Sequence, residues 1–137
     1  KEQGHKVITI SGSPIELVRE MALKYGFHDY KGAEYLLDKN EVYTGEVVAM
    51  WDSISKKNAI MDFVNKYDIN LDESYAYGDT SGDFSMFQIV KYPVCVNPTK
   101  ELIEKVVTDK VVKEKVQIVV ERKDVVYRLK GDNVEIY

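Results

Sequence analysis

The chain has 137 residues, 45% of them hydrophobic and 31% charged, which is typical of one globular domain with a sizeable core. A formal net charge of -4 offers no basic surface, so nucleic acid is not expected as a partner. No apolar stretch approaches the ~20 residues of a membrane span, and a single cysteine permits no internal disulfide, so we expect a cytoplasmic protein without a membrane partner.

The chain opens on polar residues that end in a glycine, Gly4. Glycine often closes a helix because it adopts the left-handed backbone conformation without strain. Lys1–Gln3 are therefore predicted to be the last turn of a helix. From this we expect the chain to begin inside an element, with something missing upstream.

A β-branched run at residues 7–10 predicts a buried strand, and a helix is expected to follow it. Ser13 suits the N-cap of that helix, Pro14 its first position, and Glu16 completes a capping box. Apolar side chains then recur at helical spacing until Gly26, which is expected to end the helix.

Ser11 and Gly12 fall between the predicted strand end and the predicted helix start. Free backbone N–H groups and the helix dipole make such a position a natural phosphate site, and the Ser11 hydroxyl adds a further donor. A plain strand-to-helix loop explains the same residues equally well, so the two interpretations stay open at this point.

Residues 30–37 and 42–48 are two strand-like runs on either side of a polar turn. This pattern predicts a β-hairpin over residues 30–48. The hairpin is too short to be a domain, so we interpret it as a small flap inserted into an α/β framework.

Two consecutive lysines, Lys56 and Lys57, lie in the predicted first turn of the next helix, which Ser53 or Ser55 is expected to cap. Cations at this end oppose the helix dipole, so a lysine placed here often contacts an anion. A solvated lysine pair is the simpler alternative. The apolar face of this helix is predicted to consist of Ile60, Met61, Phe63, Val64 and Tyr67.

The most informative stretch is residues 78–83, Gly-Asp-Thr-Ser-Gly-Asp, between a predicted strand and a predicted helix. Its two carboxylates, Asp79 and Asp83, lie on a tight turn of the kind that lines a ligand crevice at the carboxyl end of a parallel strand. Oxygen ligands clustered in this way suit a hard cation, above all Mg²⁺.

Three other interpretations of this stretch compete. A plain turn is one of them, because its residues are turn formers. A calcium loop would need a glutamate at its twelfth position, which is Val90 when counted from Asp79. Residues 79–82 also resemble the active-site turn of aspartic proteases, but the helical spacing after them does not fit that nearly all-β fold.

The rest of the chain predicts a strand at residues 92–96 and a short helix at residues 101–107. The tail alternates between apolar and polar side chains. We expect it to form a hairpin of residues 116–122 and 125–130, with a third strand at residues 134–137.

Three of these signals follow one another in the chain: Ser11-Gly12 between strand and helix, Lys57 at a helix start, and residues 78–83. In this order they resemble the second, third and fourth motifs of the haloacid dehalogenase superfamily of phosphotransferases, in particular its phosphoserine-phosphatase-like branch. The resemblance implies an α/β fold with a Rossmann-like core, a parallel sheet, a small β-hairpin flap and a β-rich C-terminal extension. Residues 1–107 would form the partial core, and residues 108–137 the extension of the same domain.

The resemblance also implies roles for individual residues. Ser11 and Gly12 would hold phosphate oxygens, and Lys57 would place a positive charge against both the phosphate and the nucleophile, with its preceding lysine as the alternative. Asp79 would bind Mg²⁺, and Asp83 would be a second carboxylate of the metal site, directly or through water.

The family's first motif, two aspartates separated by one residue, does not occur anywhere in this chain. In the family these aspartates are the nucleophile and the general acid/base, so both would lie upstream of Lys1 together with a helical cap. We therefore expect a Mg²⁺-dependent phosphatase that acts on a small phosphomonoester through an aspartyl-phosphate, and we expect this chain alone to be inactive.

Two alternatives stay open: a non-catalytic module that binds an anion and a metal, and a phosphotransferase or mutase that uses the same site. Ser13-Pro14 replaces the Gly-Phe pair that phosphoserine phosphatases usually show after Ser-Gly. This departure leaves the substrate open, and the sequence does not predict the oligomeric state.

Overall fold

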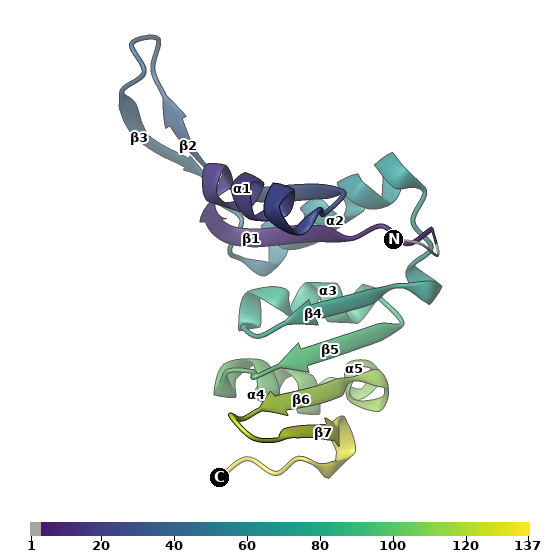
Figure 1. Ribbon diagram of the computed structural model, residues 1–137. Helices are drawn as coiled ribbons and strands as arrows, with labels where there is room; N and C mark the ends of the chain where they lie inside the picture. The colour runs from purple at the N-terminus through teal and green to yellow at the C-terminus, as the bar shows by residue number, and fades with distance from the viewer. Residues whose placement is uncertain (1–3) are drawn as a thin grey trace. The chain divides into compact units, whose positions relative to one another are not determined.

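The computed structural model describes residues 4–137, so the helix turn expected over Lys1–Gln3 lies outside the described residues. Gly4 has a φ of +78°, in the left-handed region. The chain forms two compact units, of which one ends at Ser55 and the other begins at Lys56 (Figure 1). Both combine helices with a β-sheet, so the predicted α/β class is confirmed.

The first unit is a sheet of three strands with one helix. Its elements are β1 (Ile8–Pro14), α1 (Ile15–Tyr25), β2 (Asp29–Leu37) and β3 (Tyr43–Val48), and the strands lie in the order β1-β2-β3. β1 and β2 are parallel, so α1 serves as the crossover connection that a parallel pair needs. α1 ends at Gly26 as predicted, and this glycine has a φ of +67°.

The start of α1 differs from the prediction. β1 continues through Ser11 and Gly12 to Pro14, and Pro14 is the N-cap without any side-chain cap bond, so the predicted N-cap at Ser13 with a capping box at Glu16 is wrong. The physical reason is the backbone of Pro14 itself, which has a φ of -52° and a ψ of 137° and so is not helical, and the helix begins one residue later than predicted, at Ile15. Ser13 therefore stays in the strand.

The predicted hairpin is present, and its first strand also belongs to the parallel pair. β2 and β3 are antiparallel, with Tyr35 opposite Val47. The first half of β2 pairs instead with β1, where Tyr30 lies opposite Thr9. The hairpin is thus the continuation of a sheet strand (Figure 1).

The second unit is built on a sheet with the strand order β4-β5-β6-β7, in which the first three strands are parallel and β7 is antiparallel. The strands are β4 (Tyr75–Gly78), β5 (Tyr92–Val96), β6 (Gln117–Glu121) and β7 (Val126–Lys130). The helices are α2 (Ser53–Tyr67), of which the part from Lys56 onward belongs to this unit, α3 (Phe84–Ile89), α4 (Lys100–Thr108) and α5 (Lys110–Lys115). The 3-10 turns lie at Leu71–Glu73, Ser81–Asp83 and Gly131–Asn133.

The tail of the chain belongs to this same sheet. β6 and β7 form the predicted hairpin, and β6 also pairs with β5, so the sheet continues across residue 107. The third strand predicted at residues 134–137 is wrong, because these residues have no regular structure. After β7 the chain leaves the sheet in a 3-10 turn that begins at the buried Gly131, and this glycine packs on the backbone of Lys113 in α5.

Helices α3, α4 and α5 pack against the sheet and form the core of the second unit. Alternation along the strands directs every second side chain of β5 and β6 toward these helices. The core cluster consists of Met86, Phe87, Cys95, Leu102, Val106, Val112, Val116 and Ile118. Ala76 of β4 and Phe84 at the start of α3 pack against this cluster, so the loop between them has a rigid base. Within the described part of the chain, no helix is long and apolar enough to cross a membrane.

Candidate functional site

The loop after β4 depends on a close approach between Gly78 and Asp83. A Cβ atom on Gly78 would lie 2.5 Å from the Cβ atom of Asp83, so this position accepts only glycine without a shift. Gly78 is the last residue of β4 and lies opposite Cys95 of β5. The glycine therefore lets Asp83 fold back over the end of the strand.

Asp83 is almost fully buried, with 4% of its surface exposed. Its Oδ2 atom accepts hydrogen bonds from the backbone N–H groups of Asp79 and Thr80, at 3.0 and 3.2 Å. Thr80 and Asp83 also form a reciprocal capping box at the 3-10 turn. The Asp83 carboxylate therefore fixes the backbone that carries Asp79.

The other oxygen of this carboxylate, Oδ1, accepts a hydrogen bond from Nζ of Lys56 at 2.5 Å. Lys56 is 7% exposed and lies on the buried face of α2 with Ala59 and Phe63, at positions i, i+3 and i+7. Lys57 is rotated by about 100° from Lys56 around the helix and is exposed. The geometry thus joins Lys56, and not the predicted Lys57, to the aspartate loop.

Asp52 fixes the start of α2. Its Oδ1 atom accepts a hydrogen bond from the N–H group of Ser55 at 2.8 Å, and the Ser55 hydroxyl donates to Oδ2 at 2.8 Å. These bonds, the backbone one first, hold the pKa of the Asp52 carboxyl below its usual value. The prediction of Ser53 or Ser55 as the cap is therefore wrong, since an ionised carboxylate makes the stronger cap bonds.

Asp79 has an exposed side chain, and its carboxylate makes no hydrogen bond or ion pair within residues 4–137. Its backbone is held from a second side, because its carbonyl oxygen accepts a hydrogen bond from the N–H group of Thr99 at 2.8 Å. The Thr99 side chain in turn caps α4. A free carboxylate on a fixed backbone suits the binding of a cation.

The two predicted metal ligands therefore differ in what they can bind. Among residues 4–137 the Asp79 carboxylate has no partner, whereas both oxygens of Asp83 already accept hydrogen bonds, from Lys56 and from the loop backbone. Residues 4–137 contain no group of three or more His, Cys, Asp or Glu side chains that could hold a metal ion. Asp79 thus fits as one ligand of Mg²⁺, and Asp83 fits as the residue that positions the loop.

Ser11 and Gly12 lie in the last part of β1, where the pairing register with β2 shifts, and both are partly buried. The Ser11 Oγ atom accepts a hydrogen bond from the N–H group of Ser13 at 3.1 Å, which leaves its own proton for a ligand. A Cβ atom on Gly12 would lie 2.9 Å from the Cβ atom of Trp51, so Trp51 packs directly on this glycine. This part of the predicted site belongs to the first unit, and the lysines and aspartates belong to the second.

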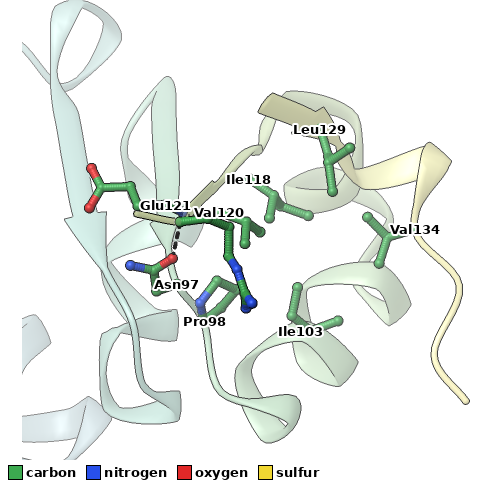
Figure 2. A pocket seen from close by; sticks show the side chains of 9 residues that line it. Asn97, Pro98, Ile103, Ile118, Val120, Glu121, Leu129 and Val134 are labelled. Atoms are coloured by element: carbon green, nitrogen blue, oxygen red, sulfur yellow. Dashed lines mark hydrogen bonds between the residues drawn. The ribbon is translucent and has the colours of Figure 1, made fainter. Parts of the chain in front are cut away.

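A separate hollow of about 510 Å³ opens on the second unit. Figure 2 shows side chains from β6, β7, α4 and the tail converging on it: Ile118, Val120, Leu129, Ile103 and Val134. The rest of its lining is Asn97, Pro98, Glu121 and Arg122. No residue of the predicted site lines this hollow, so it is not part of the candidate site.

A model of the family described as haloacid dehalogenase-like hydrolase matches residues 1–88. The chain therefore belongs to the haloacid dehalogenase-like hydrolase family. It is 30% identical over 127 residues to a phosphoserine phosphatase of Methanocaldococcus jannaschii. This match covers 90% of the chain and 54% of the relative, so the chain spans about half the length of that protein.

Solved structures of the family share the fold. A phosphoserine phosphatase in its apo form has a TM-score of 0.65 at 23% identity, over 76% of this chain and 52% of that one. A substrate-bound phosphoserine phosphatase has a TM-score of 0.65 at 21% identity, over 89% and 53%. A family hydrolase of Salmonella enterica serovar Typhi also reaches 0.65, at 18% identity, over 76% and 36%. At these identities the likeness shows the fold, and the predicted fold family is confirmed.

Sequence reasoning missed Trp51 and Thr99 as parts of the candidate site. Trp51 lies just before a helix, outside any periodic pattern, and the available signal was that it is the single tryptophan of the chain. Thr99 was visible only as a helix cap, because its bond to Asp79 joins two loops that are distant in the sequence.

Proposed function

We propose that this chain forms the phosphate- and metal-binding part of a Mg²⁺-dependent phosphatase that acts on a small phosphomonoester. The observation that carries the proposal is the buried contact between Lys56 and Asp83, whose carboxylate also holds the backbone of the exposed Asp79. Burying two charges costs desolvation free energy, so such a pair beside a strand end is a candidate functional site. The membership in a hydrolase family and the phosphoserine phosphatase relative support this reaction class.

In this proposal Lys56 supplies the positive charge of the site. Its ammonium group has three protons, of which Asp83 accepts one. Within residues 4–137 the other two have no acceptor, so they would donate to a phosphate oxygen and stabilise the negative charge that develops there. The role that the sequence predicted for Lys57 thus passes to Lys56, because Asp83 orients the Lys56 ammonium and Lys57 is exposed.

Ser11 and Gly12 would bind the phosphate oxygens. The Ser11 hydroxyl has a proton to donate. The segment from Ser11 to Ser13 also falls between the paired residues Ile10 and Pro14, at a break in the β1–β2 register. A glycine there lets a phosphate approach the backbone closely.

Asp79 would supply a carboxylate ligand for Mg²⁺, and Asp83 would orient that ligand through the loop backbone. When bound, the cation neutralises negative charge on the phosphate. The nucleophile and the acid/base of the family would come from the paired aspartates, which are absent from this chain. We therefore expect no turnover by the 137-residue chain alone.

The test is the hydrolysis of an aryl phosphate and of phosphoserine, with Mg²⁺ and with a chelator in its place. It compares the 137-residue chain with a longer form that carries an Asp-x-Asp strand upstream. We expect Mg²⁺-dependent turnover by the longer form only. Lys57→Ala serves as the matched control for Lys56→Ala, because the two lysines are neighbours and only Lys56 contacts Asp83.

Turnover by the 137-residue chain itself would contradict the proposed division of roles. A longer form that hydrolyses none of several phosphate esters would favour the non-catalytic module. In that case the lysine and aspartates would be interpreted as a retained anion and cation site.

A further inference from the structure

Trp51 is the single tryptophan of the chain, and it is half exposed next to Ser11-Gly12. A Cβ atom on Gly12 would lie 2.9 Å from the Cβ atom of Trp51 and 3.4 Å from its Cα atom. The backbone of Trp51 therefore packs against the glycine of the candidate phosphate site. All of these residues belong to the first unit, so the arrangement depends on that unit alone.

The position of Trp51 is fixed on both sides. Met50 before it is buried in the first unit, and Asp52 after it caps α2 through Ser55. Ile54, three residues further on, is 75% exposed. The backbone of Trp51 is thus held between a buried residue and a helix cap, while its side chain is 48% exposed near the exposed Ile54.

We propose that Trp51 is a specificity-determining residue, which packs against the organic group of an ester whose phosphoryl group is held at Ser11 and Gly12. This inference rests on the proposed function. It assigns the substrate class as phosphomonoesters with a planar or apolar group close to the ester oxygen.

The ester oxygen is a direct substituent of phosphorus, so the organic group begins within a few ångström of a phosphate bound at Ser11. Aromatic rings interact at centroid separations of about 4.5–7 Å, which is within reach of a tryptophan whose Cβ atom packs on Gly12. About half of the Trp51 surface is exposed, so part of this side chain is accessible to such a group.

The test uses binding to the 137-residue chain, in Mg²⁺ buffer, and needs no turnover. The ligands are inorganic phosphate, methyl phosphate and phenyl phosphate, measured by calorimetry and by Trp51 fluorescence. We expect phenyl phosphate to bind roughly two- to tenfold more tightly than methyl phosphate, the range typical of an aromatic pair. We also expect it to change the fluorescence more than inorganic phosphate does.

Two variants isolate the indole. Trp51→Phe and Trp51→Leu both keep the Cβ atom that packs on Gly12, so the backbone contact is preserved. We expect Trp51→Leu to bind phenyl and methyl phosphate equally and Trp51→Phe to retain the preference. Ser11→Ala should weaken both esters by the same factor, because it removes a donor to the phosphate.

The outcomes separate this inference from the proposed function. Suppose that inorganic phosphate binds but phenyl phosphate binds no more tightly than methyl phosphate. The role of Trp51 is then overturned, and the phosphate site is retained. The same conclusion follows if phenyl phosphate still binds more tightly than methyl phosphate in Trp51→Leu. If no phosphate compound binds and Ser11→Ala changes nothing, both proposals are overturned together.

Discussion

The two parts of the candidate site differ in how completely the protein itself satisfies their polar groups. In the second unit, both oxygens of the buried Asp83 accept hydrogen bonds, from Lys56 and from two backbone N–H groups. In the first unit, Ser11 and Gly12 are only partly buried, and the Ser11 side chain makes one local hydrogen bond. The aspartate loop is preorganised, whereas the Ser11-Gly12 segment is left open to a ligand.

Because of this difference, we expect substitutions in the two parts of the site to affect stability to different degrees. A buried and fully bonded polar network is costly to disturb, because each partner that loses its bond stays in a low-dielectric environment. A partly exposed hydroxyl can lose its ligand bond and turn to water instead. Substitutions of the buried pair, Lys56 and Asp83, should therefore affect folding, and those at Ser11 should affect binding alone.

The largest effect is expected from Lys56→Ala. It leaves the Asp83 carboxylate buried without its cation, which should lower the free energy of unfolding by about 3–5 kcal/mol. Lys57→Ala, on the exposed side of the same helix, should change it by no more than about 0.5 kcal/mol. Urea denaturation followed by circular dichroism measures both. Equal effects of the two substitutions would break the distinction between the two lysines.

Asp79→Asn should separate chemistry from stability in the same loop. The Asp79 carboxylate is exposed and makes no bond within the described residues, so we expect a stability change of at most about 0.5 kcal/mol. If the longer form with an Asp-x-Asp strand is active as proposed, its kcat should fall at least about a hundredfold, the scale for losing one electrostatic group at the reacting centre. Measuring kcat against Mg²⁺ concentration, with Ser11→Ala as the matched change in the first unit, tests this. Unchanged kcat would remove Asp79 from the metal site.

The sequence predicted most of the fold because its signals are local. Strand and helix positions follow from side-chain periodicity, and the order of the three motifs was enough to place the chain in its family. The errors lie where a neighbour decides the local structure. Pro14 is extended and ends β1, so α1 begins one residue later than predicted, and the buried Gly131 packs where the tail leaves the sheet.

The choice between Lys56 and Lys57 could not be made from the pattern. The predicted apolar face of α2 was broad, from Ile60 through Tyr67, so the rotation of the helix about its axis was uncertain by about one residue, or 100°. The structure buries Ala59 and Phe63, which turns Lys56 inward. The hydrogen bonds of Asp83 could not be predicted from the sequence either, because they depend on the backbone of a 3-10 turn.

The two glycines of the candidate site allow a matched comparison of smaller size. Gly78→Ala places a Cβ atom 2.5 Å from the Asp83 Cβ atom, so it should displace this aspartate and cost about 1–3 kcal/mol. Gly12→Ala brings its Cβ to 2.9 Å from the Trp51 Cβ atom, in a more exposed region, so we expect about 1 kcal/mol or less. Thermal denaturation of both variants gives the order, and the reverse order would mean that the Ser11-Gly12 segment is the more rigid part.

The single cysteine, which lies in the second unit and is fully buried, gives a pH-dependent effect. Burial, and then the charge of Asp83, raise the pKa of the Cys95 thiol from 9.0 to about 12. The unfolded chain therefore releases a proton above about pH 9 that the folded chain retains. The sign follows: below pH 9 the thiol has no effect, and at pH 10 it should lower the free energy of unfolding by about 1 kcal/mol. Cys95→Val should lack this decrease.

Cys95 and Trp51 together test whether the two units unfold separately. Buried hydrophobic residues are few and mostly small in the first unit: Val18, Ala22, Ala33 and Met50. The second unit contains the whole core cluster that includes Cys95. At pH 8, where the thiol is neutral in both states, we expect Trp51 fluorescence to change at a lower urea concentration than the labelling of Cys95 by a thiol reagent. If the fluorescence and labelling transitions coincide, the Ser11-Gly12 segment and the aspartate loop unfold as one cooperative unit. A ligand that binds at Ser11 would then stabilise the aspartate loop as well.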